Sequence, residues 1–210
     1  MKITVIGAGN MGAGFVKQLS AAGHTVRLTA RDIDKAHAVA AGHAGVEVLP
    51  PARALADSQI VIVATPFGEA VSALRSLGNL AGRIVIDITN PLTPDYMGLT
   101  LGFDTSAAEQ IATALPEAQV VKAFNTLLAQ VLAAGPDFGG QQRAPVFYAS
   151  DSESAKASVH ELIASIGFEG VDAGALRNAR YLEPLAGLNI YFAYGAGHGT
   201  QIAPQWLHRS

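Results

Sequence analysis

A glycine-rich turn near the start of the 210-residue chain has the spacing of a phosphate-binding loop. Gly7, Gly9 and Gly12 form the pattern G-x-G-x-x-G, with Asn10 and Met11 between the last two glycines. The first glycine permits a tight bend, the second lets the backbone approach a pyrophosphate, and the third lets the next helix pack against the preceding strand. A helix that begins here offers free N–H groups and a positive dipole to the anion. The turn therefore predicts a dinucleotide site.

The sequence around the turn supplies the context that this pattern needs. The apolar run Lys2–Ile6 reads as a strand before it. Phe15, Val16 and Leu19 give the segment after it one apolar face, which indicates a helix. A second strand, Thr25–Thr29, follows. The match is therefore much more specific than the pattern alone.

The end of the second strand indicates which dinucleotide is bound. Proteins that bind NAD usually place an Asp or Glu there to hold the ribose 2′-hydroxyl. This chain has Ala30 at that position, followed by Arg31, whose guanidinium suits bidentate contacts to a phosphate. Thr29 adds a hydroxyl and Lys35 a further positive charge, although two aspartates close by offset part of it. We expect NADP(H) in preference to NAD(H).

The ends of later strands should form the rest of the pocket, because ligands of open α/β sheets lie at the carboxyl ends of the strands. Three of these ends carry polar side chains, two of them next to prolines, which predicts a nicotinamide and acceptor pocket. They are Ala64 with Thr65 and Pro66 at the end of the strand 59–64, Asn90 and Pro91 after the strand 83–88, and Asn125 and Thr126 after the strand 119–123. Turn chemistry alone would explain any single one of them equally well.

Three side chains are candidates for a chemical role: Asn90, Lys122 and Asn125. Lys122 is the one tempting proton donor, which reduction of an ordinary ketone would require. The chain has no Ser-His-Asp arrangement and no H-E-x-x-H motif. Hydride transfer between two redox cofactors needs little acid–base help, since the protein mainly orients the partners and excludes water. That reaction suits this set of residues best.

Short β-rich runs alternate with helical patterns, which predicts an α/β fold with a Rossmann-type, doubly wound, mainly parallel sheet. The predicted strands are Lys2–Ile6, Thr25–Thr29, Gln59–Ala64, Arg83–Ile88, Gln119–Ala123, Ala144–Tyr148 and Gly167–Asp172. The predicted helices are Met11–Ala22, Asp34–Ala41, Gly68–Leu77, Ser106–Leu115, Thr126–Ala133 and Glu153–Ile166. Two stretches rich in glycine or proline, residues 90–102 and 134–143, are predicted loops.

The alternation of strands and helices stops at Asp172, which suggests a division of the chain. We expect residues 1–172 to form an NADP-binding Rossmann domain. Residues 173–210 would form a small C-terminal helical segment packed on it. Leu176–Tyr194 reads as one long helix, broken by Gly187 and ended by Gly195.

Composition narrows the functional class. The chain is 50% hydrophobic and 15% charged, with a net charge of −3, so there is no electrostatic reason to expect a nucleic acid or an anionic membrane as partner. It has no cysteine, its histidines lack metal-ligand spacing, and it has no apolar stretch that could span a bilayer. We expect a cytoplasmic protein without a bound metal, whose partner is a small redox molecule.

Several motifs together resemble a known family. They are Gly7–Gly12, Arg31, Asp87–Leu92, Val121–Thr126 and Asp172–Arg180. The set looks like the NADP-dependent reductases of the deazaflavin coenzyme F420, and the cytosolic domain of STEAP-type metalloreductases is similar. Lys122–Asn125 and the terminal stretch Tyr191–Ser210 depart from the pattern of the deazaflavin reductases.

The resemblance implies hydride exchange between NADPH and a flavin-like or deazaflavin (F420) ring stacked near the nicotinamide. It implies that Arg31 binds the 2′-phosphate and that Thr65–Pro66 and Asn90–Pro91 border the nicotinamide. Gly174–Asn178 and the helix after it would border the second ring. It also implies a dimer, for which the apolar helix at Leu182–Tyr194 offers a surface, although burial within the chain explains that helix equally well.

Other functions stay open at this point. Relatives of β-hydroxyacid dehydrogenases and pyrroline-carboxylate reductases, which reduce a small carbonyl or imine substrate, share the start of the chain. They carry a large helical domain for which this chain is too short. Reduction of flavin or ferric iron is another interpretation, and a non-catalytic NADPH sensor is a third. One fold hosts many functions, so the fold alone does not decide among them.

Overall fold

A computed structural model describes residues 1–207 and 209, and over these residues one eight-stranded sheet has the order β3-β2-β1-β4-β5-β6-β7-β8. The strands are β1 (Lys2–Ile6), β2 (Thr25–Thr29), β3 (Val46–Val48), β4 (Ile60–Val63), β5 (Ile84–Asp87), β6 (Gln119–Ala123), β7 (Pro145–Ala149) and β8 (Glu169–Asp172). Only the β6–β7 pairing is antiparallel within this sheet. The predicted Rossmann-type, mainly parallel α/β fold is confirmed.

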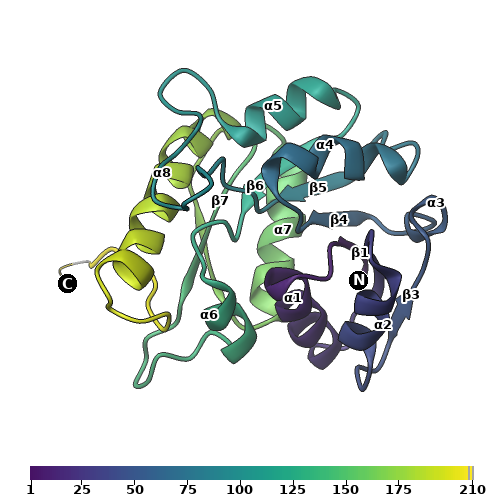
Figure 1. The fold of residues 1–210 in the computed structure, drawn as a ribbon, viewed down its shortest axis with the longest axis horizontal. Helices are drawn as coiled ribbons and strands as arrows, with labels where there is room; N and C mark the ends of the chain where they lie inside the picture. Colours follow the sequence, from purple (N-terminus) through teal and green to yellow (C-terminus); the bar gives the residue numbers. More distant parts are fainter. Residues whose placement is uncertain (208, 210) are drawn as a thin grey trace.

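Helices connect and cover these strands (Figure 1). They are α1 (Asn10–Ala21), α2 (Ile33–Ala40), α3 (Pro51–Ala54), α4 (Phe67–Ser76), α5 (Ala107–Ala114), α6 (Ala129–Ala134), α7 (Glu153–Ser165) and α8 (Ala179–Ile190), with a 3-10 turn η1 (Leu176–Asn178) and a π-helical turn η2 (Tyr191–Gly195). All seven predicted strands and the six predicted helices before Asp172 are present, with ends shifted by a few residues. Residues 208 and 210, which belong to the predicted C-terminal segment, lie outside the described residues.

Two short elements were missed by the sequence prediction. β3 has three residues at the edge of the sheet, and α3 is a single turn that begins at a proline. Neither is long enough to show a periodic pattern. The pairing of β3 with β2 gives it its place, since Val26 lies opposite Val46 in the parallel register.

The predicted break at Gly187 is wrong. α8 runs through Gly187 to Ile190 and continues into the π-helical turn η2. A glycine inside a helix costs about 1 kcal/mol relative to alanine, an amount that packing readily offsets. Here the side chain of Leu99 lies 3.8 Å from the position that a Cβ of Gly187 would occupy, so the loop before α5 packs against the helix at this residue.

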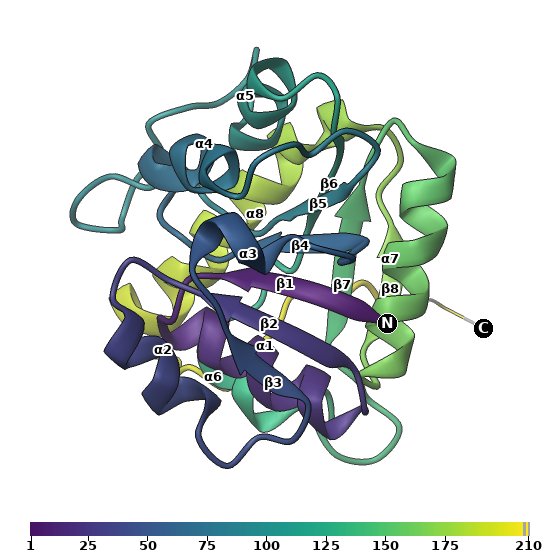
Figure 2. The ribbon, with the colours of Figure 1, turned by 90° about the vertical axis from the view of Figure 1, so that its right-hand side faces the viewer.

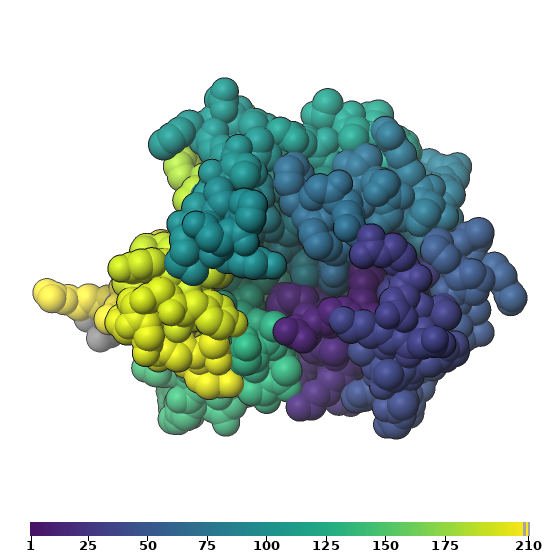
Figure 3. Space-filling model, in the orientation of Figure 1, coloured from purple at the N-terminus to yellow at the C-terminus, as the bar shows by residue number. Residues whose placement is uncertain are grey.

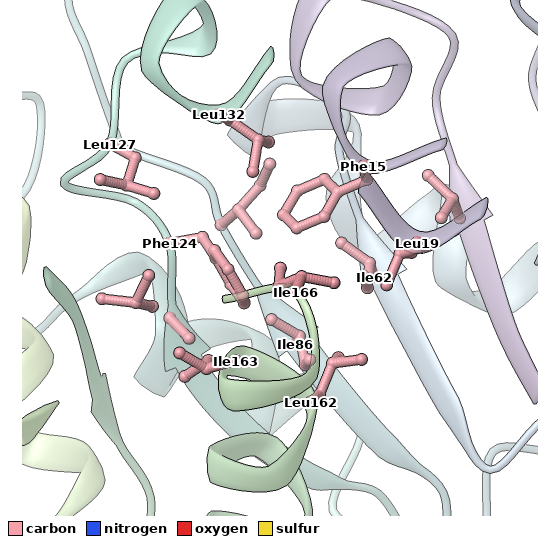
Figure 4. Close-up of a cluster of buried hydrophobic side chains, with 14 of the residues drawn as sticks. Phe15, Leu19, Ile62, Ile86, Phe124, Leu127, Leu132, Leu162, Ile163 and Ile166 are labelled. Carbon is pink, nitrogen blue, oxygen red and sulfur yellow. The ribbon is translucent and has the colours of Figure 1, made fainter. Parts of the chain in front are cut away.

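Two apolar layers enclose the sheet. α1, α6 and α7 pack on one face, where Phe15, Ile62 and Leu162 belong to one buried cluster (Figure 4). α4 and α5 cover the other face, where Leu74 and Ile111 are fully buried. Figure 2 shows α4 and α5 on one side of the strands and α1 and α6 on the other. Strands covered on both faces are apolar throughout, as β4 is.

The order of the strands places the predicted site. The chain leaves β1 for β2 and β3 on one side, then crosses to β4 on the other side of β1. β1 and β4 pair in parallel, with Ile6 opposite Val63, so the segments after both strands start at the same edge. Ligands of open α/β sheets bind at this change of direction.

Candidate functional site

The three glycines of the turn after β1 have different structural roles. Gly7 has a φ of 113°, and a Cβ there would lie 2.3 Å from the carbonyl oxygen of Ala64. A Cβ at Gly12 would lie 1.9 Å from the carbonyl oxygen of Gly7, so the turn cannot close with a side chain at either position. A Cβ at Gly9 would meet no atom within 4 Å. Packing does not require glycine at position 9, and the open space leaves its backbone accessible to a ligand.

The N-terminus of α1 carries no side-chain cap. Gly9 occupies the N-cap position, and no acidic residue lies in the first turn, where Asn10 is exposed and Met11 half-buried. Three other helices do have side-chain caps: Asp32 on α2, Ser106 on α5 and Ser152 on α7. An uncapped helix start beside a glycine turn offers backbone N–H groups to an anion.

The end of β2 has the groups expected for a 2′-phosphate and lacks the carboxylate that would repel it. The side chain of Arg31 is 88% exposed, and its Nη1 lies 3.4 Å from Oε1 of Glu69. Ala30 supplies no charge. Thr29 is buried, and its carbonyl oxygen accepts a hydrogen bond of 2.8 Å from the N–H of Gly7. The guanidinium is therefore held only at the surface and is free to turn toward a phosphate.

The two aspartates that follow Arg31 are placed differently from one another. The carboxylate of Asp32 caps α2 and accepts a hydrogen bond of 3.0 Å from the backbone N–H of Lys35. Its negative charge thus interacts with the N-terminus of α2. Asp34 and the side chain of Lys35 are exposed. Asp32 therefore directs its negative charge at the start of α2 and offsets less of the positive charge at Arg31.

Unsatisfied polar atoms gather at one edge of the sheet. Among residues 1–207 and 209, five buried side-chain atoms have no hydrogen-bond partner: Thr29 Oγ1, Thr65 Oγ1, Thr89 Oγ1, Asn125 Oδ1 and Thr126 Oγ1. All five lie at or just after the carboxyl ends of β2, β4, β5 and β6. Buried polar groups are normally paired, so such a concentration marks an edge where a ligand or ordered water completes the bonding.

The predicted nicotinamide residues also lie at this edge. Ala64 and Thr65 are half-buried after β4, and Pro66 occupies the N-cap position of α4. Asn90 is half-buried after β5, and Pro91 is buried beside it. In Figure 3 the surface is hollowed near its centre, between the purple N-terminal segment and the teal segment of the middle of the chain.

Asn90 and Asn125 are brought together by reciprocal hydrogen bonds. Nδ2 of Asn90 donates to the carbonyl oxygen of Asn125 at 3.0 Å, and Nδ2 of Asn125 donates to Oδ1 of Asn90 at 3.0 Å. Nδ2 of Asn125 also donates to the carbonyl oxygen of Leu182 in α8, at 2.9 Å. Phe124 precedes this pair with a φ of 61°, and its ring packs edge-on against Phe15 at 5.0 Å (Figure 4).

Lys122 has an environment unlike that of a proton donor to a substrate. It is fully buried, and its Nζ lies 2.8 Å from Oδ2 of Asp87 and 2.7 Å from Oε1 of Glu183. Nζ also donates to the carbonyl oxygen of Thr89 at 2.5 Å. These three acceptors use all the donors of an ammonium group. The expectation that Lys122 is the candidate acid therefore has no geometric support.

Glu183 is a site residue that sequence reasoning missed. Its carboxylate accepts hydrogen bonds from the backbone N–H groups of Ala107 and Ala108 at the start of α5, at 3.0 and 3.3 Å. Burial raises the pKa of its carboxyl group, which the nearby ammonium of Lys122 partly counters. The one signal in the sequence was an acidic residue in a mainly apolar helix, next to Leu182.

A separate cavity of about 1050 Å³ lies between the loop before α5 and the first half of α8. It is lined by Leu99–Thr105 and by Arg177, Asn178, Arg180, Tyr181 and Pro184. Asn178 comes from the segment predicted to border the second ring, but the predicted nicotinamide residues do not line this cavity. In the described part of the chain, no group of three or more histidines and carboxylates is placed to hold a metal ion.

The residues at this edge fit an NADP dinucleotide. The glycine cradle, the turn Gly7–Gly12, has no room for a Cβ at Gly7 or Gly12 and open space at Gly9, the adjoining helix start is uncapped, and β2 ends in Arg31 without an acid. The fold and the site thus define a Rossmann-type dinucleotide-binding protein. Comparisons with known proteins identify the family within this class.

The chain belongs to the family described as NADP oxidoreductase, coenzyme F420-dependent, whose pattern matches residues 2–91. A crystal structure from Arthrobacter sp. FB24, described as a candidate F420-dependent NADP reductase, is 30% identical with a TM-score of 0.87. It covers 99% of this chain and 100% of its own. The chain is therefore an NADP-dependent oxidoreductase, which confirms the predicted family and enzyme class.

In two further comparisons, the matched region is a smaller part of the other protein. Metalloreductase STEAP3 of Rattus norvegicus is 31% identical over 185 residues, which are 88% of this chain but only 36% of the relative. The chain thus spans about a third of that curated relative. A reductive aminase from Aspergillus terreus shares the fold, with a TM-score of 0.68, 22% identity and coverage of 93% of this chain and 62% of its own. Among the described residues, no helix is long and apolar enough to cross a membrane.

Proposed function

We propose that this chain transfers hydride between NADPH and a flavin-like or deazaflavin acceptor. The observation that carries the proposal is the glycine cradle beside the uncapped start of α1, followed by a β2 end that carries Arg31 in place of an acid. The pyrophosphate would lie on the backbone of Gly9, Asn10 and Met11. Arg31 would hold the 2′-phosphate, with Thr29 and Lys35 as neighbours.

Each remaining residue has a positioning role in this proposal. Ala64, Thr65 and Pro66 would border one side of the nicotinamide, and Asn90 and Pro91 the other. Asn125 fixes the side chain of Asn90 through its two hydrogen bonds. Bound NADPH would supply the hydride, so the protein needs to hold the two rings together and keep water out.

Among the residues that the structure describes, the burial of the candidate acid Lys122 favours a flavin-like acceptor over a carbonyl or imine. Lys122, the one candidate donor, is buried and bonded to three acceptors. A ring that accepts hydride at carbon or nitrogen and takes any proton from solvent makes no demand on such a group. The description of the matched family points to coenzyme F420 itself. Reduction of flavin or ferric iron is the second candidate, because the STEAP metalloreductases are similar in sequence.

Anaerobic oxidation of NADPH by the purified protein tests the proposal. Coenzyme F420, free flavin, and flavin with a ferric chelate are offered in parallel, with NADH as the control donor. Turnover with F420 alone would support the deazaflavin assignment. Turnover only with flavin or iron would replace it with a metalloreductase-like activity. NADPH binding without oxidation by any acceptor would contradict hydride transfer and leave a sensor as the interpretation.

A homodimer and a cytoplasmic location are further proposals. The outward face of α8 and η2 exposes apolar side chains: Tyr181 at 75%, Leu188 at 49%, Tyr191 at 50% and Tyr194 at 55%. A face of this kind suits a second copy of the chain. Sedimentation at micromolar concentration, repeated with Leu188→Glu, would show a dimer and its loss, whereas a monomer in both cases would reject the dimer.

We also propose that residues 173–210 act as a small C-terminal unit on the 1–172 domain.

A further inference from the structure

Three charged side chains meet in the interior next to the ends of β5 and β6. Asp87 and Lys122 lie opposite each other in the parallel register of β5 and β6, and Glu183 reaches them from α8. The side chains of Asp87 and Lys122 are completely buried and that of Glu183 is 3% exposed. The cluster joins two strands and a helix that are far apart in the sequence.

A buried ion cluster is a poor device for stability alone. Removing charges from water carries a large cost, and well-packed apolar residues of similar volume often serve the fold as well or better. This cluster has two carboxylates for one ammonium, so the N–H groups of Ala107 and Ala108 are needed to support Glu183. The cluster is therefore better explained by the geometry that it imposes.

That geometry is transmitted to the candidate nicotinamide edge. Oδ1 of Asp87 accepts a hydrogen bond of 2.8 Å from the N–H of Thr89, and Lys122 donates to the carbonyl oxygen of the same residue. Both polar groups of the Thr89 backbone are thereby fixed immediately before Asn90. Asn90 is in turn bonded to Asn125.

Side-chain hydrogen bonds also tie the segment after β6 to α8. Nδ2 of Asn125 donates to the carbonyl oxygen of Leu182, the residue before Glu183. About two turns further along the helix, Nδ2 of Asn189 donates to the carbonyl oxygen of Thr126 at 3.0 Å. The ends of β5 and β6 and the helix α8 are therefore held as one unit by side-chain bonds.

We propose that Lys122 and Glu183 are positioning residues, which hold Asn90 and Asn125 in register with the nicotinamide and tie that edge to α8. Neither residue donates a proton to the substrate. The inference rests on the proposed function, because it assumes that the nicotinamide lies beside Asn90. A positioning role differs from a purely structural role because it predicts weaker binding of the nicotinamide half of the cofactor alone.

Binding measurements separate the two halves of the cofactor. Adenosine 2′,5′-bisphosphate carries the 2′-phosphate but no nicotinamide, so the ratio of its Kd to that of NADPH reports the nicotinamide contribution. In Glu183→Gln we expect the Kd for the bisphosphate to stay within about twofold and the ratio to fall about fivefold, the size of one misplaced hydrogen bond. The single-turnover hydride-transfer rate would fall about tenfold or more, with the shape of its pH profile unchanged.

Lys122→Met is the stronger variant, and Lys156→Met is its matched control. Lys156 is a nearly buried lysine on α7 whose ion pairs are with Asp172 and Glu153 and not with the Asp87 and Glu183 cluster. We expect Lys122→Met to lower the ratio and Lys156→Met to leave it unchanged. If Lys122→Met does not fold, Glu183→Gln decides, because it keeps the neutral pair of Lys122 with Asp87.

The outcomes distinguish failure of this inference from failure of the proposed function. An unchanged ratio in folded Glu183→Gln, or an equal weakening of both ligands, would overturn the positioning role. A pH profile that shifts with Glu183→Gln would also overturn it, because proton donation would then involve the cluster. Wild-type protein that binds neither ligand would remove the proposed function itself. Wild-type protein that binds NADPH but reduces no acceptor would leave the ratio as a valid test of positioning.

Discussion

The two halves of the proposed site, a cofactor half around β1, β2 and β4 and an acceptor half around β5, β6 and α8, are built differently. Around β1, β2 and β4 the site is made mainly of backbone: two glycines without room for a Cβ and an uncapped helix start, with one surface arginine beside them. Around β5, β6 and α8 it is made of side chains, where a buried lysine bonds to two carboxylates and two asparagines bond to each other.

This difference explains which part of the function is easier to assign. Backbone recognition of a pyrophosphate needs only a short local motif, and many proteins share it. The matched family pattern covers residues 2–91, which include all of β1, β2 and β4 but only β5 from the acceptor half. The geometry of the acceptor half depends on pairs far apart in the chain, such as Asp87 with Lys122, 35 positions away. The nucleotide is therefore well defined, and the acceptor has to be found by experiment.

The largest expected effect would come from removing the central charge of the acceptor half. Lys122→Met leaves Asp87 and Glu183 buried without their counter-ion, and we expect the free energy of unfolding to fall by about 3–5 kcal/mol. Urea denaturation measures it. Lys156→Met removes a lysine whose partner Glu153 is 85% exposed, and it should cost about 1 kcal/mol or less. Equal losses in the two variants would mean that the buried cluster is no more important than a surface pair.

The next effect concerns the choice of nucleotide in the cofactor half. Arg31→Ala removes the proposed charge-assisted bonds to the 2′-phosphate, worth about 1.5–3 kcal/mol, so the Kd for NADPH should rise about 10- to 100-fold. The Kd for NADH should stay the same. Arg53→Ala, which removes an exposed arginine from α3, is the control and should change neither. Full retention of NADPH preference in Arg31→Ala would refute the assignment of the 2′-phosphate.

A companion change sharpens this test. Glu69 is the carboxylate nearest to the guanidinium of Arg31, at 3.4 Å. Glu69→Gln should strengthen NADPH binding by about twofold or less, since exposed pairs of this kind contribute little. A marked weakening would show that Glu69 holds Arg31 in its binding position.

Substitutions in the turn separate folding from binding. Gly12→Ala places a Cβ 1.9 Å from a backbone oxygen, and we expect it to destabilise the protein by about 1–3 kcal/mol. Gly9→Ala has open space and an ordinary φ of −79°, so stability should stay within about 0.5 kcal/mol. NADPH affinity should nevertheless fall about tenfold in Gly9→Ala, because the methyl group occupies the path of the pyrophosphate. Normal affinity in Gly9→Ala would place the pyrophosphate elsewhere.

A further small effect, on stability, is a pH dependence at the outer end of the α5–α8 contact. The guanidinium of Arg180 and the hydroxyl of Ser106 hold the pKa of Glu109 below its usual value of 4.5. A carboxyl group with a depressed pKa in the folded state stabilises the fold above that value, and the contribution is lost as pH falls below it. Glu109→Gln should therefore flatten the decline in the free energy of unfolding below pH 4.5, by about 1 kcal/mol or less. An unchanged pH dependence would remove this ion pair from the stabilising contacts of α8.

The sequence was sufficient for the elements that rest on local patterns. The strands β1, β2 and β6 were predicted at their observed bounds, because alternating apolar runs and a glycine turn mark them without reference to the rest of the chain. Short elements such as β3 carry no such pattern, and Gly187 was read as a break because its contact with Leu99 cannot be seen in one dimension.

The sequence by itself determined the fold class, the dinucleotide turn and the family, since each depends on residues that are close neighbours in the chain. Only the tertiary structure decided what surrounds Lys122. As a lysine at the end of a strand it had the chemistry of a proton donor. The fold surrounds it with Asp87, Glu183 and the carbonyl oxygen of Thr89 and leaves no exposed surface. Burial and long-range pairing determine the role of a charged group, and the sequence of the strand that carries it does not reveal either one.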